Sequence, residues 1–349
     1  MISLCIITKN NEKTLANCLA SVKPIIQEII LVDTGSTDKT IEIAKEFQAK
    51  IFHFSWNNNF SDAKNYALEQ ASEEWILALD ADEAISQLDY KEIQELIKDK
   101  EASGFFLIQR NYTNQIGQFN SISTLGDNYK ESRIAKSYVP RKMIRLFKNS
   151  PEIRFEGAVH DSVEKSIKKF GKIKDSAVQI HHFGLLDRSP ERIKQYIEIE
   201  KANLKDDWFQ DYQIAAQLHS IGNLEESITF LNKSIANNPI FALSWLELGI
   251  IQIKQQKFKE ALESLNKSLE LEKHPMTLDH LGIVHSKLGN YKEAEYSFKQ
   301  AISLLPNNAD IHFNLGLLYN QQGKKQQAFH ELKIACQLNS EYNKYIEFS

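Results

Sequence analysis

Short apolar runs alternate with longer amphipathic stretches over the first part of the chain, up to about residue 150. The runs are rich in β-branched residues and have strand length, whereas the stretches between them repeat their apolar positions with helical spacing. This alternation is typical of βαβ units around a mainly parallel sheet, so we expect an α/β domain. The expected strands are 2–7, 29–32, 51–54, 75–79, 105–108 and 177–180, and the expected helices are 12–22, 38–47, 62–70, 90–98 and 162–170.

A different pattern begins at residue 208, where no strand signal remains and a fixed period appears. Gly222, Gly289 and Gly323 align as turn glycines between helices, and counting back from each gives the start of a repeat. A period of 34 residues is that of tetratricopeptide (TPR) repeats, and residues 208–349 resemble that family. The repeats start near Trp208, Ala242, Pro275 and Ala309, and their matching positions include Leu248-Gly249, Leu281-Gly282, Leu315-Gly316, Ala261, Ala294 and Ala328.

A single helical hairpin of this length cannot bury its apolar face, but stacked hairpins share one core and present a concave surface. We therefore expect an all-α TPR solenoid over residues 208–349, after an α/β domain over residues 1–189. Residues 190–207 form the expected helical connector, with Ser189 as the N-cap and Pro190 in the first turn. Pattern alone thus predicts two domains of different class.

The composition of the 349 residues, with 42% hydrophobic and 25% charged, is that of a folded soluble protein. No apolar run approaches the ~20 residues that span a bilayer, and the first residues lack the apolar core of a signal peptide. Three scattered cysteines predict neither a disulfide framework nor a zinc site. We expect a cytoplasmic protein, which could act at the inner face of the membrane.

Charge gives one further indication. The net charge of −4 provides no general attraction to nucleic acid, so we expect no nucleic-acid partner. Residues 130–174, however, carry 13 Lys and Arg against 5 Asp and Glu. This excess is either a solvated basic face or a surface for an anionic ligand such as a diphosphate.

The sharpest chemical signal is the pair Asp80 and Asp82, directly after the expected strand 75–79. Ligand sites of open α/β sheets lie at the carboxyl ends of strands, and two close carboxylates favour Mg²⁺ or Mn²⁺ between them. A second acid, Asp33, also follows a strand and could accept a hydrogen bond from N3–H of uracil. Acidic pairs are also common in plain loops, and Asp33 could instead be a helix-entry turn residue.

Four segments in order, 6–12, 32–40, 60–65 and 75–83, resemble the motifs of family two glycosyltransferases with the GT-A fold. The resemblance covers roughly residues 1–200 and implies a nucleotide-sugar transferase. It implies that Thr8 and Asp33 contact the nucleotide, that Asp82 binds the metal, and that Asp80 faces the ribose and the metal. Further donor-binding candidates are Asn10, Lys64, Asn65, Arg141 and Arg145.

The chain departs from this family at Lys64, because members usually have Arg there. Lysine keeps the charge but loses the bidentate fork, which leaves the donor base less certain. The segment 141–161 resembles one that ends in Gly-x-x-His-Glu in the same family, with Asp161 as its final acid. Asp161 is our candidate general base and Glu156 the second choice, although Asp161 could simply cap the helix 162–170.

Two neighbouring histidines, His181 and His182, follow the expected strand 177–180 and resemble the C-terminal histidine motif of GT-A enzymes. Adjacent side chains of a strand point to opposite faces, so both cannot easily serve one site. His182 fits the pattern better and joins Asp80 and Asp82 as a candidate metal ligand. Packing of either ring in a core is the alternative.

These expectations combine into an inverting glycosyltransferase that uses Mn²⁺ or Mg²⁺ and a nucleotide-sugar donor, with UDP as the expected nucleotide. The TPR groove would recruit the acceptor, for example a peptide or protein, as in the bacteriocin S-glycosyltransferases that the chain resembles. Similar catalytic domains also build lipopolysaccharide and cell-envelope glycans, and fold cannot choose between them. An inactive transferase-like TPR scaffold and a nucleotidyltransferase are further alternatives, and the sequence leaves a homodimer open.

Overall fold

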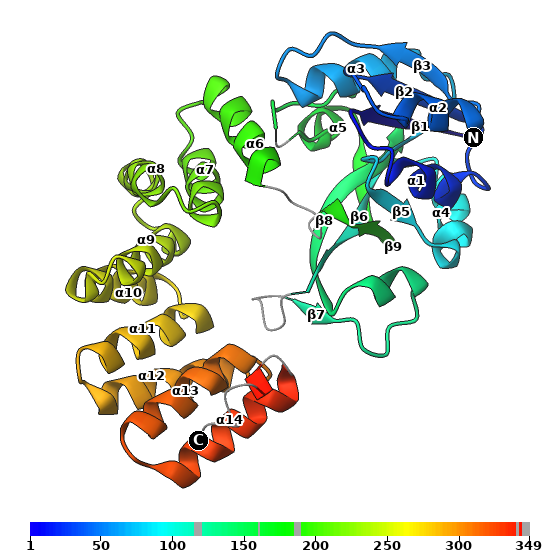
Figure 1. Cartoon of the computed structure of the whole chain (residues 1–349). Helices are drawn as coiled ribbons and strands as arrows, with labels where there is room; N and C mark the ends of the chain where they lie inside the picture. The colour runs from blue at the N-terminus through cyan, green and yellow to red at the C-terminus, as the bar shows by residue number, and fades with distance from the viewer. Residues whose placement is uncertain (115–120, 160, 185–189, 340–341, 344–349) are drawn as a thin grey trace. The chain divides into compact units, whose positions relative to one another are not determined.

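The computed structural model describes residues 1–114, 121–159, 161–184, 190–339 and 342–343 of the chain. It forms two compact units: the first contains Met1–Asn114 and Asn120–Ser189, and the second contains Pro190–Ser349. The first is a mixed α/β unit, and the second is built from helices (Figure 1).

The sheet of the first unit has the strand order β3-β2-β1-β4-β8-β6-β9-β5, with β7 paired to β8. The first four strands are parallel, but β8 is antiparallel to both β4 and β6. The expectation of a mainly parallel sheet is therefore wrong for the second half of the sheet. The strands are β1 Ile2–Thr8, β2 Glu28–Asp33, β3 Lys50–His53, β4 Trp75–Ala78, β5 Glu83–Ile85, β6 Ala102–Thr113, β7 Ile122–Ser123, β8 Ser137–Lys148 and β9 Lys172–His182.

Helices cover both faces of this sheet because its central strands are apolar on both sides. On one face, Leu4 and Ile6 of β1 share a buried cluster with residues of α1, α2 and α4. On the other face, Cys5 and Ile30 share a cluster with residues of α3 and α5. These helices are α1 Leu15–Val22, α2 Thr40–Glu46, α3 Phe60–Gln70, α4 Tyr90–Leu96 and α5 Glu164–Phe170, with short 3-10 turns at Gln87–Asp89 and Lys130–Ile134.

Several elements differ from their sequence-based expectation, each for a local reason. Strands β5 and β8 were not expected, because β5 has three residues and β8 begins with polar and basic residues that hide its alternation. Helix α2 begins two residues later than expected, since the carboxylate of Asp38 accepts from the backbone N–H of Glu12 and of Thr40. The connector helix α6 spans Pro190–Ala202 and ends five residues before Asp207.

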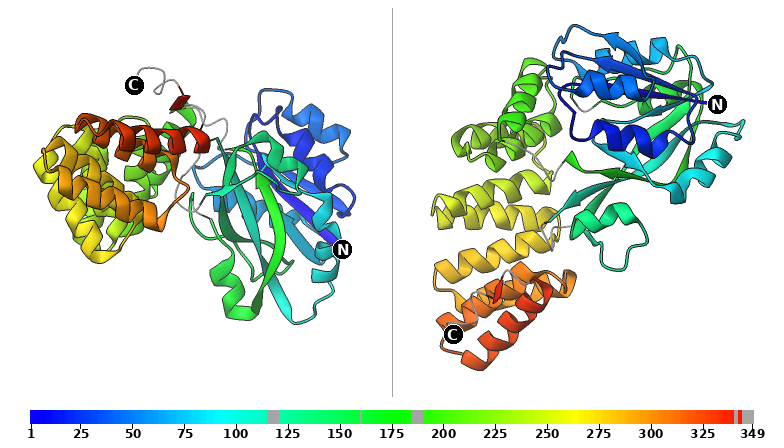
Figure 2. Two further views of the ribbon diagram at one scale, coloured as in Figure 1. Left: turned by 90° about the horizontal axis from the view of Figure 1, so that it is seen from below. Right: turned by 45° about the vertical axis from the view of Figure 1, so that its right-hand side comes forward.

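The second unit continues with four helical pairs, seen as stacked hairpins in Figure 2. The first helix of each pair begins at the residue from which the period was counted. A close contact recurs 16 residues apart in three pairs: a Cβ on Gly249, Gly282 or Gly316 would lie 2.6–2.8 Å from Leu265, Phe298 or Leu332. The helices are α7 Trp208–Ser220, α8 Leu224–Asn237, α9 Ala242–Lys254, α10 Phe258–Leu271, α11 Pro275–Lys287, α12 Tyr291–Leu304, α13 Ala309–Gln321 and α14 Lys325–Leu338.

The turn between the paired helices needs a left-handed residue. Gly222, Gly289 and Gly323 have φ of +82°, +81° and +71°, and the second pair places Gln256 there with φ of +60°. This explains why the sequence offers three aligned glycines for four repeats. Within the described ranges, none of the helices combines the length and the apolar character that spanning a bilayer requires.

Candidate active site

A cluster of buried charges lies where β4 ends and β5 begins. Asp80 follows β4, and its backbone N–H donates to Glu83 Oε2 over 2.8 Å. The Glu83 side chain is fully buried, and its Oε1 accepts hydrogen bonds from Gln109 on β6 and from Arg145 on β8. Glu83 therefore connects the loop after β4 to strands β6 and β8.

Arg145 reaches this cluster from an irregularity in β8. Phe105 of β6 pairs with Leu146, and the next residue pairs with Ile144, which leaves Arg145 without a partner in the β6 register. Such a bulge bends the strand and redirects a side chain. The Arg145 guanidinium lies 2.6 Å from Asp80 Oδ2 and 3.4 Å from Glu83 Oε1.

Lys64 joins two candidate residues that are far apart in the sequence. It lies on α3 and is only 8% exposed. Its Nζ is 3.2 Å from Asp80 Oδ1 and 2.8 Å from Asp161 Oδ2. The strand-end acid and the candidate base thus face the same ammonium group.

Asp161 does not cap the following helix. The N-cap of α5 is Val163, and the hydroxyl of Ser162 accepts from the backbone N–H of Glu164. The alternative interpretation of Asp161 as a helix cap is therefore wrong, and its carboxylate faces Lys64 instead.

These pairs determine the charge states. Burial alone would raise the pKa of Asp80, but Arg145 and Lys64 hold it well below its usual range. Burial would lower the pKa of Lys64, but Asp161 and Asp80 raise it above its ordinary value. For Glu83, burial outweighs the attraction of Arg145 and raises the pKa.

Asp82 and His182 form a second part of the cluster. His182 Nε2 lies 3.7 Å from Asp82 Oδ1, and Nδ1 is bonded to the side-chain oxygen of Asn111 over 2.7 Å. That bond orients the ring so that Nε2 faces Asp82. Burial would lower the pKa of His182, but the carboxylate of Asp82 raises it above its ordinary value.

The backbone of Gly184 lies close against this pair. A Cβ built on Gly184 would lie 2.3 Å from Asp82 Oδ2 and 2.7 Å from His182 Nε2, so a side chain there would collide with both groups. Within the described residues, no three His, Cys, Asp or Glu side chains gather to enclose a metal. One carboxylate and one imidazole fit a divalent cation that takes its other ligands from a bound diphosphate and water.

The neighbouring strand ends carry the candidate nucleotide residues. Asp33 pairs in register with Thr8, is buried, and accepts from the backbone N–H of Gly35 and Ser36. The Asn10 side-chain oxygen accepts from Thr37 N–H over 2.8 Å and so holds the loop after β2. Asp33 thus stabilises the turn at its own strand end, as expected if it is a helix-entry turn residue. It also remains a candidate to contact the nucleobase of the donor.

Three predicted residues lie differently. The Asn65 amide donates to the C=O of Phe155 over 3.0 Å and accepts from its N–H over 2.8 Å, so it fixes the chain before Gly157. Arg141 is exposed on β8, four residues from Arg145. Glu156 is exposed, and its backbone forms a bridge with Ser162.

Sequence reasoning missed Glu83, Gln109, Asn111 and Gly184. Glu83 stood in the quoted acidic segment, but nothing local showed that it would be buried against an arginine from β8. Gln109 and Asn111 lie two residues apart on β6, whose contribution to the site depends on long-range pairing. His181 is the other ring of the pair: it is buried, bonded to the Tyr112 hydroxyl, and its pKa is lowered to about 3, chiefly by burial.

Comparison with known proteins agrees with this architecture. Residues 3–156 match the model of Glycosyl transferase family 2, residues 282–323 match a TPR repeat model, and residues 242–275 and 309–342 match a Tetratricopeptide repeat model. The first match ends before Asp161 and His182. It contains Asp33, Lys64, Asp80 and Asp82.

Curated relatives carry the corresponding names. A TPR repeat-containing protein of Synechococcus elongatus is 30% identical over 67% of this chain and 56% of its own length. The SPbeta prophage-derived glycosyltransferase SunS of Bacillus subtilis is 28% identical over 66% of this chain and 52% of its own length. An uncharacterized glycosyltransferase of Rickettsia typhi is 32% identical over 49% and 56%, respectively.

The chain thus spans about half the length of the curated relatives it matches. The family model, the order of the motifs and the mixed sheet agree over the first unit, and the repeat models agree over the second. The first unit thus carries a domain of the glycosyl transferase family 2 type, and the second unit carries tetratricopeptide repeats.

Proposed function

We propose that the first unit transfers a sugar from a nucleotide-sugar donor, with UDP as the nucleotide, to an acceptor in one inverting displacement. The observation that supports this most is the Lys64 bridge, which brings Asp80 and Asp161 to one ammonium group. A single displacement needs a base for the acceptor and stabilisation of the leaving diphosphate, and no protein nucleophile. The cluster offers both kinds of group.

Asp161 is the proposed general base. Its carboxylate is largely buried, and Lys64 keeps it in place through an ion pair. When the acceptor binds, its hydroxyl or thiol would donate a hydrogen bond to the Asp161 carboxylate beside Lys64. Asp161 would then accept the proton as the acceptor attacks the anomeric carbon. Glu156 remains the second candidate, but its exposure makes it less suited to hold an acceptor in one orientation.

Asp82 and His182 are the proposed protein ligands of Mn²⁺ or Mg²⁺. When bound, the cation would act as a Lewis acid on the donor diphosphate. Asp80 directs both carboxylate oxygens toward Arg145 and Lys64, so its part in this proposal is to hold those two cations rather than the metal. Arg145 and Lys64 then lie beside the metal pair as fixed positive charges for the leaving group.

The acceptor is the least constrained part, and we propose a polypeptide bound by the repeats. TPR hairpins expose a continuous concave surface that suits an extended chain. Truncation at Ser189 tests this, because Ile197 of α6 packs with Ile214 and Leu218 and so leaves together with the repeats. If circular dichroism shows that the shortened chain folds, it should hydrolyse the donor but transfer with a raised KM for the acceptor. Unchanged acceptor kinetics would contradict recruitment by the repeats.

A turnover screen tests the proposed activity. The full chain is incubated with UDP-, GDP-, dTDP- and CMP-sugars in Mn²⁺, and released nucleotide is measured. We expect slow hydrolysis of a UDP-sugar, and EDTA should abolish this activity. The variant Asp175→Ala, which changes an exposed surface ion pair, should hydrolyse the donor at the same rate as the wild-type protein. Release from none of the donors, or full release in EDTA, would contradict the proposal.

A further inference from the structure

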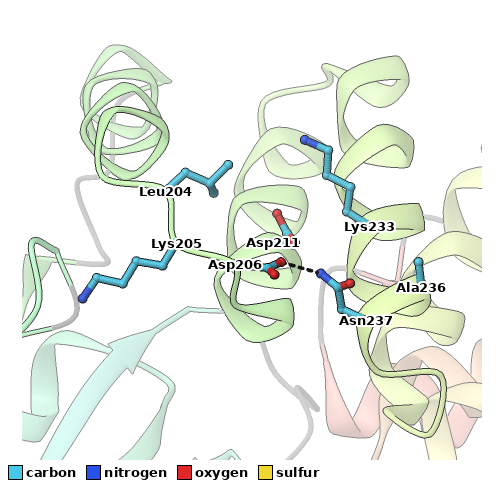
Figure 3. Close-up of a pocket in the computed structure, with 7 residues that line it drawn as sticks. All are labelled: Leu204, Lys205, Asp206, Asp211, Lys233, Ala236 and Asn237. Atoms are coloured by element: carbon cyan, nitrogen blue, oxygen red, sulfur yellow. Dashed lines mark hydrogen bonds between the residues drawn. The ribbon is translucent and has the colours of Figure 1, made fainter.

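A pocket of about 420 Å³ lies in the second unit, where the α6–α7 loop and the start of α7 face the end of α8 (Figure 3). Its lining combines the acids Asp206 and Asp211 with Lys233 and with the apolar Leu204 and Ala236. All of its residues belong to the second unit.

Two of the other three repeats place a planar ring at this position, and the third repeat has Leu278 there. The fourth residue of the first helix is Trp245 in the second repeat and His312 in the fourth. Trp245 Nε1 donates to the carbonyl of Pro239 over 2.9 Å, and His312 Nε2 lies 3.0 Å from the carbonyl of Pro306. In both repeats a planar ring is therefore bonded to the carbonyl six residues before it.

The first repeat has Asp211 at this fourth position. A carboxylate is smaller than either ring and cannot donate to the matching carbonyl, which belongs to Lys205. Asp211 is only 4% exposed, its Oδ1 is buried, and among the described residues this atom has no hydrogen-bond partner. The pocket thus has the place of a ring, with a buried acceptor in the position from which the ring would have come.

The fourth repeat shows how a carboxylate is satisfied in this setting. His312 Nδ1 lies 2.6 Å from Glu331 on α14, the second helix of the same repeat. That bond raises the pKa of His312, so the ring tends toward its planar cationic form. In the first repeat the carboxylate stands on the first helix, at the position of His312 and not of Glu331, and its Oδ1 has no hydrogen-bond partner among the described residues.

We propose that this pocket binds the guanidinium group of an arginine side chain from a partner polypeptide. The group is planar like the rings of two sister repeats, and its N–H donors match Asp211 and the carboxylate of Asp206, whose Oδ1 already accepts from Asn237 over 3.1 Å (Figure 3). Leu204 and Ala236 provide apolar walls for its faces. The site lies outside the proposed donor chemistry and does not depend on it.

The charges around the pocket agree with a cationic ligand. Burial raises the pKa of Asp211, and the nearby Asp206 and Asp207 raise it further. Lys233 lowers this pKa, but its positive charge does not offset the other effects. Lys233 lies 4.9 Å from the Phe230 ring. Figure 3 shows the side chain of Lys205 pointing away from Asp211, which leaves Lys233 as the pocket's own cation.

The test uses the isotope-labelled full chain and the tripeptide N-acetyl-Gly-Arg-Gly-amide, titrated while amide NMR signals are followed. We expect saturable shifts at Leu204, Asp206 and Ala236, and at least 5-fold weaker binding of the matched Gln tripeptide. The Lys tripeptide should bind with intermediate affinity, because an ammonium lacks the planar fork. Equal binding of the Arg and Gln tripeptides would overturn the proposal, as would the absence of saturable shifts at these residues.

Two variants make the test specific. Asp211→Asn keeps the shape of the side chain and should weaken binding of the Arg tripeptide about 10-fold or more, the usual effect of removing a charge-assisted hydrogen bond. Asp211→Trp restores the side chain of the second repeat and should abolish binding while raising the Tm. Unaltered Arg affinity in Asp211→Asn would overturn the proposal even if Asp211→Trp fails to fold.

Discussion

The two units place their polar groups in opposite ways. In the first unit, charged side chains from four distant segments are buried together where strands end, as Lys64, Glu83 and Arg145 illustrate. In the second unit, the buried positions between helices are small or apolar, as at Ala261, Leu265 and Phe298. Buried charge is expensive unless it is paired, so the first arrangement is typical of a site and the second of a scaffold.

Polar side chains are also buried in the second unit, and two of the buried acids there extend this contrast. Asp279 on α11 is buried, but its carboxylate accepts from Asn314 on α13 over 3.0 Å, which links two repeats. Asp211 has no such partner for its buried Oδ1. Substitutions in the transferase cluster should therefore change turnover more than stability, whereas substitutions along the helix contacts should do the reverse.

The largest expected effect follows from Asp82→Ala. Removing one of the two proposed metal ligands should lower donor hydrolysis by about 10²–10³-fold, the scale of losing a principal electrostatic stabiliser. The Tm should change much less than turnover, because the proposed role of Asp82 is to hold the metal, and its partner His182 lies 3.7 Å away. Asp175→Ala serves as the matched control. Turnover at the original rate would exclude Asp82 from the site.

Asp161→Asn should reduce transfer to the acceptor by about 10²–10⁴-fold, the usual contribution of a general base. Donor affinity should stay nearly constant, since the proposed role concerns the acceptor proton. Glu156→Gln should have a smaller effect on transfer. Calorimetry distinguishes the roles: a loss of donor binding in Asp161→Asn would make this residue a ligand, and the base would have to be sought elsewhere.

Gly282→Ala tests the scaffold side of the comparison. The new Cβ would lie 2.6 Å from the Phe298 ring, and overpacking of this kind costs about 1–3 kcal/mol. The Tm should fall, while the rate of donor hydrolysis should not. The double variant Gly282→Ala/Phe298→Leu should recover part of the loss. An unchanged Tm in the single variant would show that the helices separate without cost.

The smallest expected effect is a pH dependence in the first unit, outside the proposed site. Asp89 Oδ1 accepts a hydrogen bond from the Tyr129 hydroxyl over 3.1 Å, whereas Oδ2 has no hydrogen-bond partner among the described residues. Burial raises the pKa of Asp89 to about 6. A raised carboxyl pKa contributes stability below pH ~4 that is lost as pH rises through about 6. Asp89→Asn should remove this loss, roughly 1–2 kcal/mol with partial solvent screening, in urea unfolding at pH 4.5 and 7.5. The same pH slope in both proteins would contradict it.

How far the sequence predicts this protein depends on the range of the interactions. The repeat helices were located well because each hairpin is local and its signals, such as Gly289 and Pro275, lie within the repeat itself. Strand β8 and the partners of Asp80 could not be predicted, because the Arg145 bulge exists only when β8 lies between β4 and β6. The motifs therefore indicated Asp80 and Asp82 as candidate site residues. They did not indicate that Asp80 would form ion pairs with both Lys64 and Arg145.

Calorimetric titration of the full chain with UDP, in Mn²⁺ and again in EDTA, tests most directly whether the cluster after β4 is a metal-dependent donor site. We expect at least 10-fold tighter binding in Mn²⁺ for the wild-type protein, and the same weak affinity in both buffers for Asp82→Ala. Equal UDP affinity of the wild-type protein with and without Mn²⁺, or a full Mn²⁺ effect in Asp82→Ala, would contradict this expectation.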